Sequence, residues 1–235
     1  MEVDGEAADA GGPQRQQRVA VSQDLSDVRL NLRNHGKGIV SIPAPYRRHN
    51  AATVLSNNES PELPPKYVAD SLMTTHFECV HPYLPVNHWP SFLSKYEDVY
   101  ASGGSLAGIS RDWAASLFGV FACGSLYLQK PNHVQEGKGY IKTCLLLLDI
   151  FKDGVSMDQV GASLLVSIFL HEVGSRVGSW VWMGSSARLG QELRLHDGSG
   201  VSPSAKLEKR RCLWWSIYCW DRLVYALLLL LLLLS

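Results

Sequence analysis

From Lys66 onward, apolar residues recur three to four positions apart, in segments separated by glycine and proline. The stretch 67–80 is typical, because its apolar stripe consists of Val68, Leu72, Met73, Phe77 and Val80. This spacing puts apolar side chains on one face of an α-helix, whereas a half-buried strand needs strict alternation. No alternation of strand length occurs in the chain. The sequence therefore predicts an all-α fold, a multi-helix bundle.

Turn residues divide this region into further helices. We expect helices over 92–99, 113–128, 140–151 and 180–195, one that begins after Ser156, and a last one after Pro203. The His81–Pro82 step ends the first helix, since a residue before proline avoids helical dihedrals, and the glycines of 103–108 form a loop. The segment 113–128 is apolar nearly all round, which indicates a helix buried on every side.

Polar residues mark several helix ends. Ser156 and Gln159 fit a capping box, in which each side chain bonds the backbone amide of the other. Gly198 can take the left-handed conformation that ends the helix over 180–195. The Ser202–Pro203 step suits the start of the last helix, with serine as the N-cap and proline in the first turn.

The last predicted helix is apolar on two faces. One face carries Leu213, Ile217, Trp220 and Val224, and the adjacent face carries Trp214, Tyr218, Asp221 and Tyr225. A helix of this kind is expected to lie deep in the bundle. Asp221 and Arg222 point apart on a helix, so we expect each to need a separate internal partner, because an unpaired buried charge is costly.

Composition narrows the class of protein. The 235 residues contain 22 Lys plus Arg and 22 Asp plus Glu, so net charge does not suggest a nucleic-acid surface. The five cysteines are scattered without the close pairs of a metal cluster, and we expect them to be buried, reduced thiols of the cytosol or nucleus. The first residues are acidic and unlike a secretory signal.

We divide the chain into three parts. Residues 1–65 are rich in Gly, Pro, Gln and Asn and are predicted to be a disordered or linker segment. Residues 66–226 form the helical domain, and residues 227–235 are a poly-leucine tail. The uninterrupted apolar run from Leu223 to Leu234 is shorter than the roughly 20 residues that span a bilayer, which disfavours a membrane anchor.

Catalytic and metal-binding patterns are missing from the sequence. His171–Glu172 begins a zinc-protease pattern, but Ser175 stands where the second histidine belongs. His76, His81 and His88 are separated by prolines and no carboxylate recurs at ligand spacing. We therefore predict no catalytic, cofactor-binding or metal-ligating residue, and no enzyme activity.

Two segments allow more than one interpretation. The basic run KLEKRR, residues 206–211, could be a nuclear-localisation or phosphate-contacting patch, although a solvated first helical turn is favoured. The block 180–222 holds five of the seven tryptophans. It could line a ligand pocket, although packing between helices is favoured.

Three segments, in order, resemble the middle regulatory region of fungal zinc-cluster transcription factors. These are HFECVHPYLPVNHWPSF at 76–92, SLLVSIFLHEVGSRVGSWVWMGSSARLGQELRLH at 163–196 and KRRCLWWSIYCWDR at 209–222. In the last, the residues that match the family's Arg, aromatic and Asp–Arg positions are Arg211, Trp214, Trp215, Tyr218, Asp221 and Arg222.

The resemblance implies transcription regulation in the nucleus by a helical domain that contacts regulatory proteins or a small-molecule effector, with dimerisation possible. In that family DNA contact comes from a separate cluster of six cysteines with two zinc ions. This chain has no such cluster, so zinc and DNA binding are associated with it only through the family. The family continues into further helices where this chain has leucines, so we expect the domain to be truncated or mis-spliced, or its last residues to come from a different reading frame. The alternatives are a helical small-molecule-binding module and a tail-anchored membrane protein.

Overall fold

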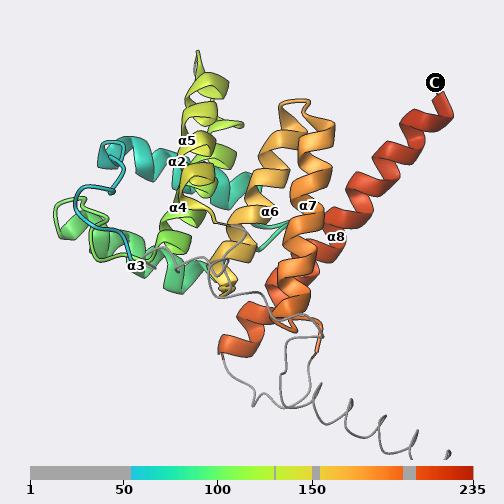
Figure 1. Cartoon of the computed structure of the whole chain (residues 1–235). Helices are drawn as coiled ribbons and strands as arrows, with labels where there is room; N and C mark the ends of the chain where they lie inside the picture. The colour runs from blue at the N-terminus through green and yellow to red at the C-terminus, as the bar shows by residue number, and fades with distance from the viewer. Residues whose placement is uncertain (1–53, 130, 150–153, 198–204, 235) are drawn as a thin grey trace, which may run out of the picture. The chain divides into compact units, whose positions relative to one another are not determined.

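The computed structural model describes residues 54–129, 131–149, 154–197 and 205–234 (Figure 1). The chain divides into two units, residues 1–49 and 50–235, and every described residue belongs to the second. Its helices are α2 (Lys66–Cys79), α3 (Trp89–Ala101), α4 (Arg111–Ser125), α5 (His133–Leu147), α6 (Met157–Glu172), α7 (Arg176–Glu192) and α8 (Ala205–Leu234). Extended pairing in the described residues amounts to one isolated bridge, Val54 with Ser110. The predicted all-α fold is confirmed.

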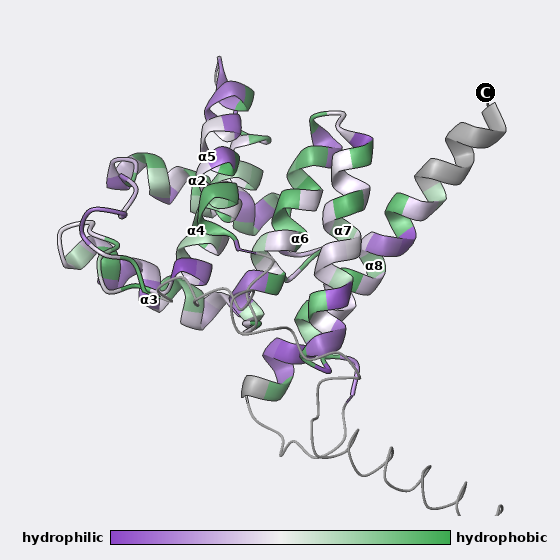
Figure 2. Cartoon of the chain, viewed as in Figure 1, coloured by the Kyte–Doolittle hydropathy of each residue, from purple (hydrophilic) through white to green (hydrophobic). Residues whose placement is uncertain are grey.

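Helix α4 lies at the centre of the described unit. It packs against α2, α5 and α6, and every residue from Asp112 to Ser125 is buried. The sequence therefore indicated correctly that this helix is covered on all sides. Helix α6 is similar, since residues 159–169 are all buried, and both helices are largely hydrophobic in Figure 2. These two apolar helices supply a large share of the buried hydrophobic residues.

Glycine allows two helices to approach α4 closely. A Cβ on Gly124 would collide with the carbonyl oxygen of Leu72 in α2. A Cβ on Gly137 of α5 would collide with the Ser125 hydroxyl at the end of α4. This packing explains why α5 begins at His133, before the predicted start at Tyr140, in spite of its glycines. The predicted end at Phe151 lies outside the described residues, and α5 ends at Leu147.

Half of the predicted capping box is present. The Ser156 hydroxyl accepts a hydrogen bond from the Gln159 amide at 3.1 Å, as expected. The reciprocal bond is not the one predicted, because the Gln159 side-chain amide donates to the Asp149 carbonyl at 2.8 Å. Gln159 is fully buried, so tertiary packing directs its amide to the end of the preceding segment instead of its own N-cap.

Helix α7 ends through a residue that the sequence did not indicate. Arg194 has φ +51°, and the amide of Leu195 donates to the Gly190 carbonyl at 3.0 Å. This is the backbone pattern of a left-handed C-terminal motif. The prediction that Gly198 ends α7 is therefore wrong, and Gly198 lies outside the described residues, as does the predicted Ser202–Pro203 start of the last helix.

Aromatic side chains join α2, α3 and α4. Trp89 stacks on Phe77 with ring centroids 4.9 Å apart, and Phe92 contacts Trp113 at 5.4 Å. Trp89 and Pro90 form the first turn of α3, so this helix begins before the predicted position at Phe92, since proline is tolerated there.

Residues 54–65, which the sequence places in the linker segment, pack against this region. The Leu55 side chain is buried and the Pro64 carbonyl accepts a hydrogen bond from Tyr100. Residues 1–53 of that predicted segment lie outside the described residues.

Candidate functional site

Helix α8, which carries the tryptophan-rich motif, contacts α6 and α7 through one face. As predicted, Leu213, Ile217, Trp220 and Val224 are all buried. Ile217 approaches α7 at Gly190, where an added Cβ would lie 3.1 Å from the isoleucine Cδ1 atom. Gly190 thus allows α8 to approach α7 closely. At Gly184 an added Cβ would instead meet Arg188, which belongs to the same helix.

A buried hydrogen-bond cluster joins α8 to α6 and α7. The Trp220 indole N–H donates to the Ser167 hydroxyl at 2.9 Å, and that hydroxyl donates to the Ser179 carbonyl at 2.8 Å. The three side chains are at most 4% exposed. The His171 ring meets the Trp220 ring edge to face at 5.3 Å. These contacts fix the position of Trp220 and the angle at which α8 crosses its neighbours.

The basic run at the start of α8 is partly used inside the fold. Lys209 forms an ion pair with Asp158 at 3.2 Å. The Arg210 guanidinium donates to the Leu193 and Arg194 carbonyls at 3.0 and 2.7 Å. It thereby satisfies carbonyls that the end of α7 leaves unpaired. Neither the solvated-turn interpretation nor the phosphate-patch interpretation included this role.

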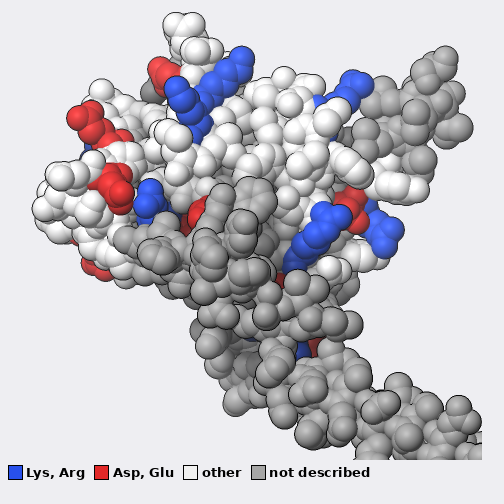
Figure 3. Space-filling model, viewed as in Figure 1, with Lys and Arg blue, Asp and Glu red and all other residues white. Residues whose placement is uncertain are grey.

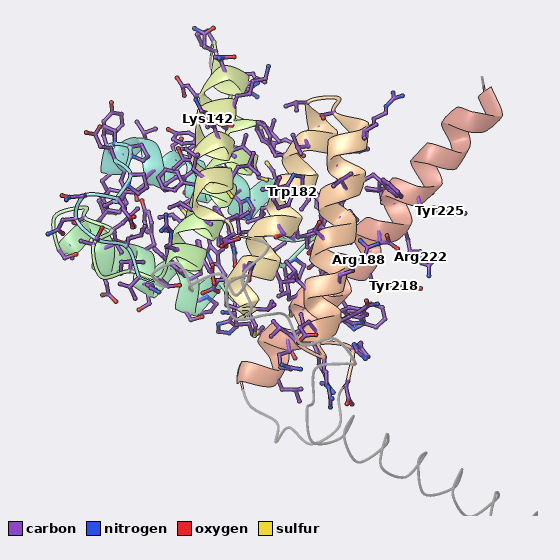
Figure 4. The ribbon with its side chains drawn as sticks, in the orientation of Figure 1. Lys142, Trp182, Arg188, Tyr218, Arg222 and Tyr225 are labelled. Carbon is purple, nitrogen blue, oxygen red and sulfur yellow. The ribbon has the colours of Figure 1, made fainter. Side chains whose placement is uncertain are left out.

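The adjacent face of α8 is exposed, so the expectation that α8 is deeply buried is wrong. Tyr218 is 44% exposed and Tyr225 is 55% exposed. Asp221 and Arg222 are also exposed, which contradicts the prediction that both need internal partners. Arg222 lies over the Tyr218 ring at 5.2 Å. Figure 4 shows Tyr218, Arg222 and Tyr225 on the side of α8 that points away from α6 and α7.

The tryptophans of the block 180–222 have several environments. Trp220 is buried, Trp182 and Trp214 are half-buried against the core, and Trp180 and Trp215 are 58% and 59% exposed. Packing between helices therefore accounts for three of the five and not for Trp180 or Trp215. Periodicity could not separate these classes, because it reports apolar faces and not which face a neighbour covers.

A pocket of about 380 Å³ opens where α2, α4, α6 and α8 end or cross. Its walls come from the end of α2 and the following loop (Cys79, Val80, Tyr83 and Leu84), the turn after α4 (Tyr127), α6 (Ile168 and Glu172) and α8 (Cys219, Trp220 and Leu223). Of the five tryptophans in the block 180–222, Trp220 alone lines this pocket. The sequence did not predict the site, since its walls come from four distant segments.

Tyr127 and Glu172 set the electrostatic character of the pocket. Burial, and next the negative charge of Glu172, raise the pKa of the Tyr127 phenol. Tyr127 is thus neutral at physiological pH. Glu172 is the only carboxylic acid among the lining residues, and the remaining walls are apolar, aromatic or thiol side chains.

The cysteines and histidines do not assemble into a metal site in the described residues. No group of three or more His, Cys, Asp or Glu side chains that could hold an ion occurs there. All five cysteines are described and free. Cys123 and Cys144 are buried as expected, whereas Cys79 and Cys212 are half-buried and Cys219 is exposed. They come from four different helices, so they do not fit the six-cysteine zinc cluster that the family resemblance brings with it.

Charged side chains are scattered over the face seen in Figure 3, with wide uncharged areas between them.

Among the described residues, no helix has the length and apolar character needed to cross a membrane.

Comparison with known proteins identifies the helical unit. The profile described as "Fungal specific transcription factor domain" matches residues 73–231, which include the second half of α2 and all of α3 to α7 and end within the leucine run of α8. No solved structure matches significantly.

Similar curated proteins are fungal transcription factors. Cutinase transcription factor 1 beta of Fusarium vanettenii is 27% identical over 70% of this chain and 19% of its own length. Transcription factor macR of Penicillium terrestre is 25% identical over 86% of this chain and 26% of its own length. Sorbicillinoid biosynthetic cluster transcription factor sor3 of Hypocrea jecorina is 28% identical over 67% of this chain and 25% of its own length.

The chain thus spans about a fifth to a quarter of the length of these relatives. The profile match alone covers more than half of the chain, and it contains all three segments on which the sequence resemblance depends. The chain belongs to the fungal specific transcription factor domain family.

Proposed function

We propose that this chain acts in transcription regulation in the nucleus, as the helical regulatory region of a fungal transcription factor, and that the exposed face of α8 binds a regulatory protein. The family match supports the general role. The observation that supports α8 as the binding surface is the row of exposed aromatic side chains on it, Trp215, Tyr218 and Tyr225. The proposal includes no catalysis.

The composition of this face suits protein recognition. Trp, Tyr and Arg are the residues most enriched at the centres of protein interfaces. Trp215, Tyr218, Arg222 and Tyr225 are spaced three, four and three residues apart, which is the spacing of a seam that packs against another helix. Because Arg222 already lies over Tyr218, less side-chain freedom is lost when a partner binds. We therefore expect the partner to present an apolar helix.

DNA contact is assigned in this proposal to a zinc-cluster domain outside the helical region. Positive and negative residues balance in the chain, and Lys209 and Arg210 are engaged with α6 and α7. A phosphate-binding surface usually gathers unpaired Lys and Arg side chains on one side.

A reporter assay tests the proposal. The 235-residue chain is fused to a heterologous DNA-binding domain, and transcription from a matching promoter is measured in a filamentous fungus. We expect the fusion to change reporter output relative to the DNA-binding domain alone. The double substitution Trp215→Ala and Tyr218→Ala should abolish most of that change, since removing interface centres of this kind weakens binding by about tenfold or more.

The matched control is Tyr67→Ala, because Tyr67 is 76% exposed and belongs to α2. It should leave reporter output unchanged. Thermal unfolding of each purified variant shows whether the fold is retained. Equal reporter output from the α8 double variant and the wild type would reject α8 as the binding surface, and a fusion without effect on transcription would reject the regulatory role.

A further inference from the structure

The pocket beside α8 has the size and walls of a small-molecule site. Its volume of about 380 Å³ lies within the range of roughly 300–1,000 Å³ that is usual for ligand pockets. Trp220 forms one wall and is held in place by its bond to Ser167. Leu223, which is 48% exposed, and Tyr83, which is 80% exposed, lie at the open side. A ligand there would cover apolar surface that solvent now contacts.

The charge in the pocket has one sign. Glu172 is the only carboxylic acid that lines the pocket, and no Lys, Arg or His lines it. Within the described part of the chain, Glu172 takes part in no salt bridge. An anionic ligand would meet repulsion here, whereas a cation would find a carboxylate without a competing partner.

The aromatic walls favour the same charge. Tyr83, Tyr127 and Trp220 line the same pocket as Glu172. Aromatic faces carry partial negative charge and attract ammonium groups. Three rings and one carboxylate together form the kind of surface that recognises an organic ammonium group.

We propose that this pocket binds a mainly apolar small molecule with one ammonium group, the cation lying at Glu172 among the rings and the apolar part against Leu223 and Ile168. The ligand is an amine-bearing aromatic or aliphatic compound. Its role as an effector rests on the proposed regulatory function, because Cys219, Trp220 and Leu223 belong to the same helix as the exposed seam. The binding itself does not depend on that function.

Three isosteric probes test the charge requirement. Purified chain of 235 residues is titrated by calorimetry with 4-phenylbutylamine, 4-phenylbutanol and 4-phenylbutyrate. We expect the amine to bind about fivefold more tightly than the alcohol, and the carboxylate more weakly than either, since an exposed ion pair and a cation–π contact together contribute roughly this much. Raising salt from about 0.05 to 0.5 M should weaken amine binding and leave alcohol binding unchanged.

Glu172→Gln should remove the preference for the amine, and Tyr127→Leu should weaken amine binding more than alcohol binding. The control is Glu192→Gln, an exposed carboxylate at the end of α7 that does not line the pocket. Equal affinity of the wild type for amine and alcohol, or an amine preference that persists in Glu172→Gln, overturns the proposal.

The fusion reporter separates binding from regulation. A reporter response to the amine in the wild type that disappears in Glu172→Gln supports the effector role. Amine-selective binding without a reporter response retains the site and overturns the effector role. An active reporter fusion whose purified chain does not bind the amine overturns the site and leaves the transcriptional role standing.

Discussion

The substitution Ser167→Ala tests how α8 is held against the bundle. The Ser167 hydroxyl accepts from the Trp220 indole at 2.9 Å and donates to the Ser179 carbonyl at 2.8 Å. Through it, α6 contacts both α7 and α8. Ser167 and Ser179 are fully buried and Trp220 is 4% exposed, so water cannot easily replace the lost oxygen.

The magnitude follows from the group that is left without a partner. Alanine leaves the indole N–H of Trp220 buried and unsatisfied, which costs about 1–3 kcal/mol. The Ser179 carbonyl belongs to α7 and keeps its helical hydrogen bond, so it contributes little. In a chain of this size 1 kcal/mol changes the melting temperature by roughly 2–4 °C. We therefore expect the melting temperature to fall by about 2–12 °C.

Differential scanning calorimetry measures the effect, with Ser163→Ala as the matched control. Ser163 is a fully buried serine of the same helix, but its hydroxyl only donates to the Gln159 carbonyl one turn earlier. It should change stability much less. Adding Trp220→Phe completes a double-mutant cycle, in which Ser167→Ala should cost less once the indole N–H is absent. Equal losses for the two serine variants, or an additive cycle, would refute the reasoning.

Three further substitutions have defined outcomes. Gly124→Ala should lower the free energy of unfolding, measured in urea, by about 1–3 kcal/mol or more, since the alanine Cβ would collide with the Leu72 carbonyl. Burial, and next the charge of His81, lower the pKa of His76 to about 3, so the unfolded chain binds the additional proton below its ordinary pKa of 6.5. His76 therefore does not lower the free energy of unfolding above pH 6.5, but lowers it by about 2 kcal/mol at pH 5. His76→Phe should remove that decrease. Asp221→Ala should change stability by less than about 0.5 kcal/mol, because the side chain is exposed.

Each of these expectations has a control. A Cβ on Gly139 meets open space, so Gly139→Ala in α5 should be neutral or stabilising. His196→Asn alters an exposed histidine and should leave the decrease between pH 7 and 5 in place. A tolerated Gly124→Ala, a pH profile unaffected by His76→Phe, or a loss of more than about 1 kcal/mol in Asp221→Ala would contradict the packing described above.

Local features of the fold could be predicted from the sequence. The end of α2 before Pro82, the N-cap at Ser156 and the buried helix α4 depend on residues within a few positions of each other. Periodicity also identified the buried stripe of α8 correctly. Proline dihedrals, side-chain caps and apolar faces act over one or two helical turns, so the neighbouring residues are sufficient to determine them.

Features that depend on contacts between distant segments could not be predicted from the sequence. The Gln159 side chain bonds Asp149 instead of its own N-cap, and Arg194 closes α7 where Gly198 was expected. In both cases a contact from another element outweighs local preference. Gly124 and Gly137 show the same dependence, because the atoms that leave no room for a side chain there belong to a neighbouring helix.

The sequence by itself determined that this chain is helical from Lys66, which helices are apolar, and which family it resembles. Only the tertiary structure decided that Trp215, Tyr218 and Asp221 face solvent while Trp220 is buried, and that Glu172 shares a pocket with Tyr127 and Trp220. The physical reason is that an apolar face is a property of one helix, whereas burial and pocket formation depend on which other helix covers that face.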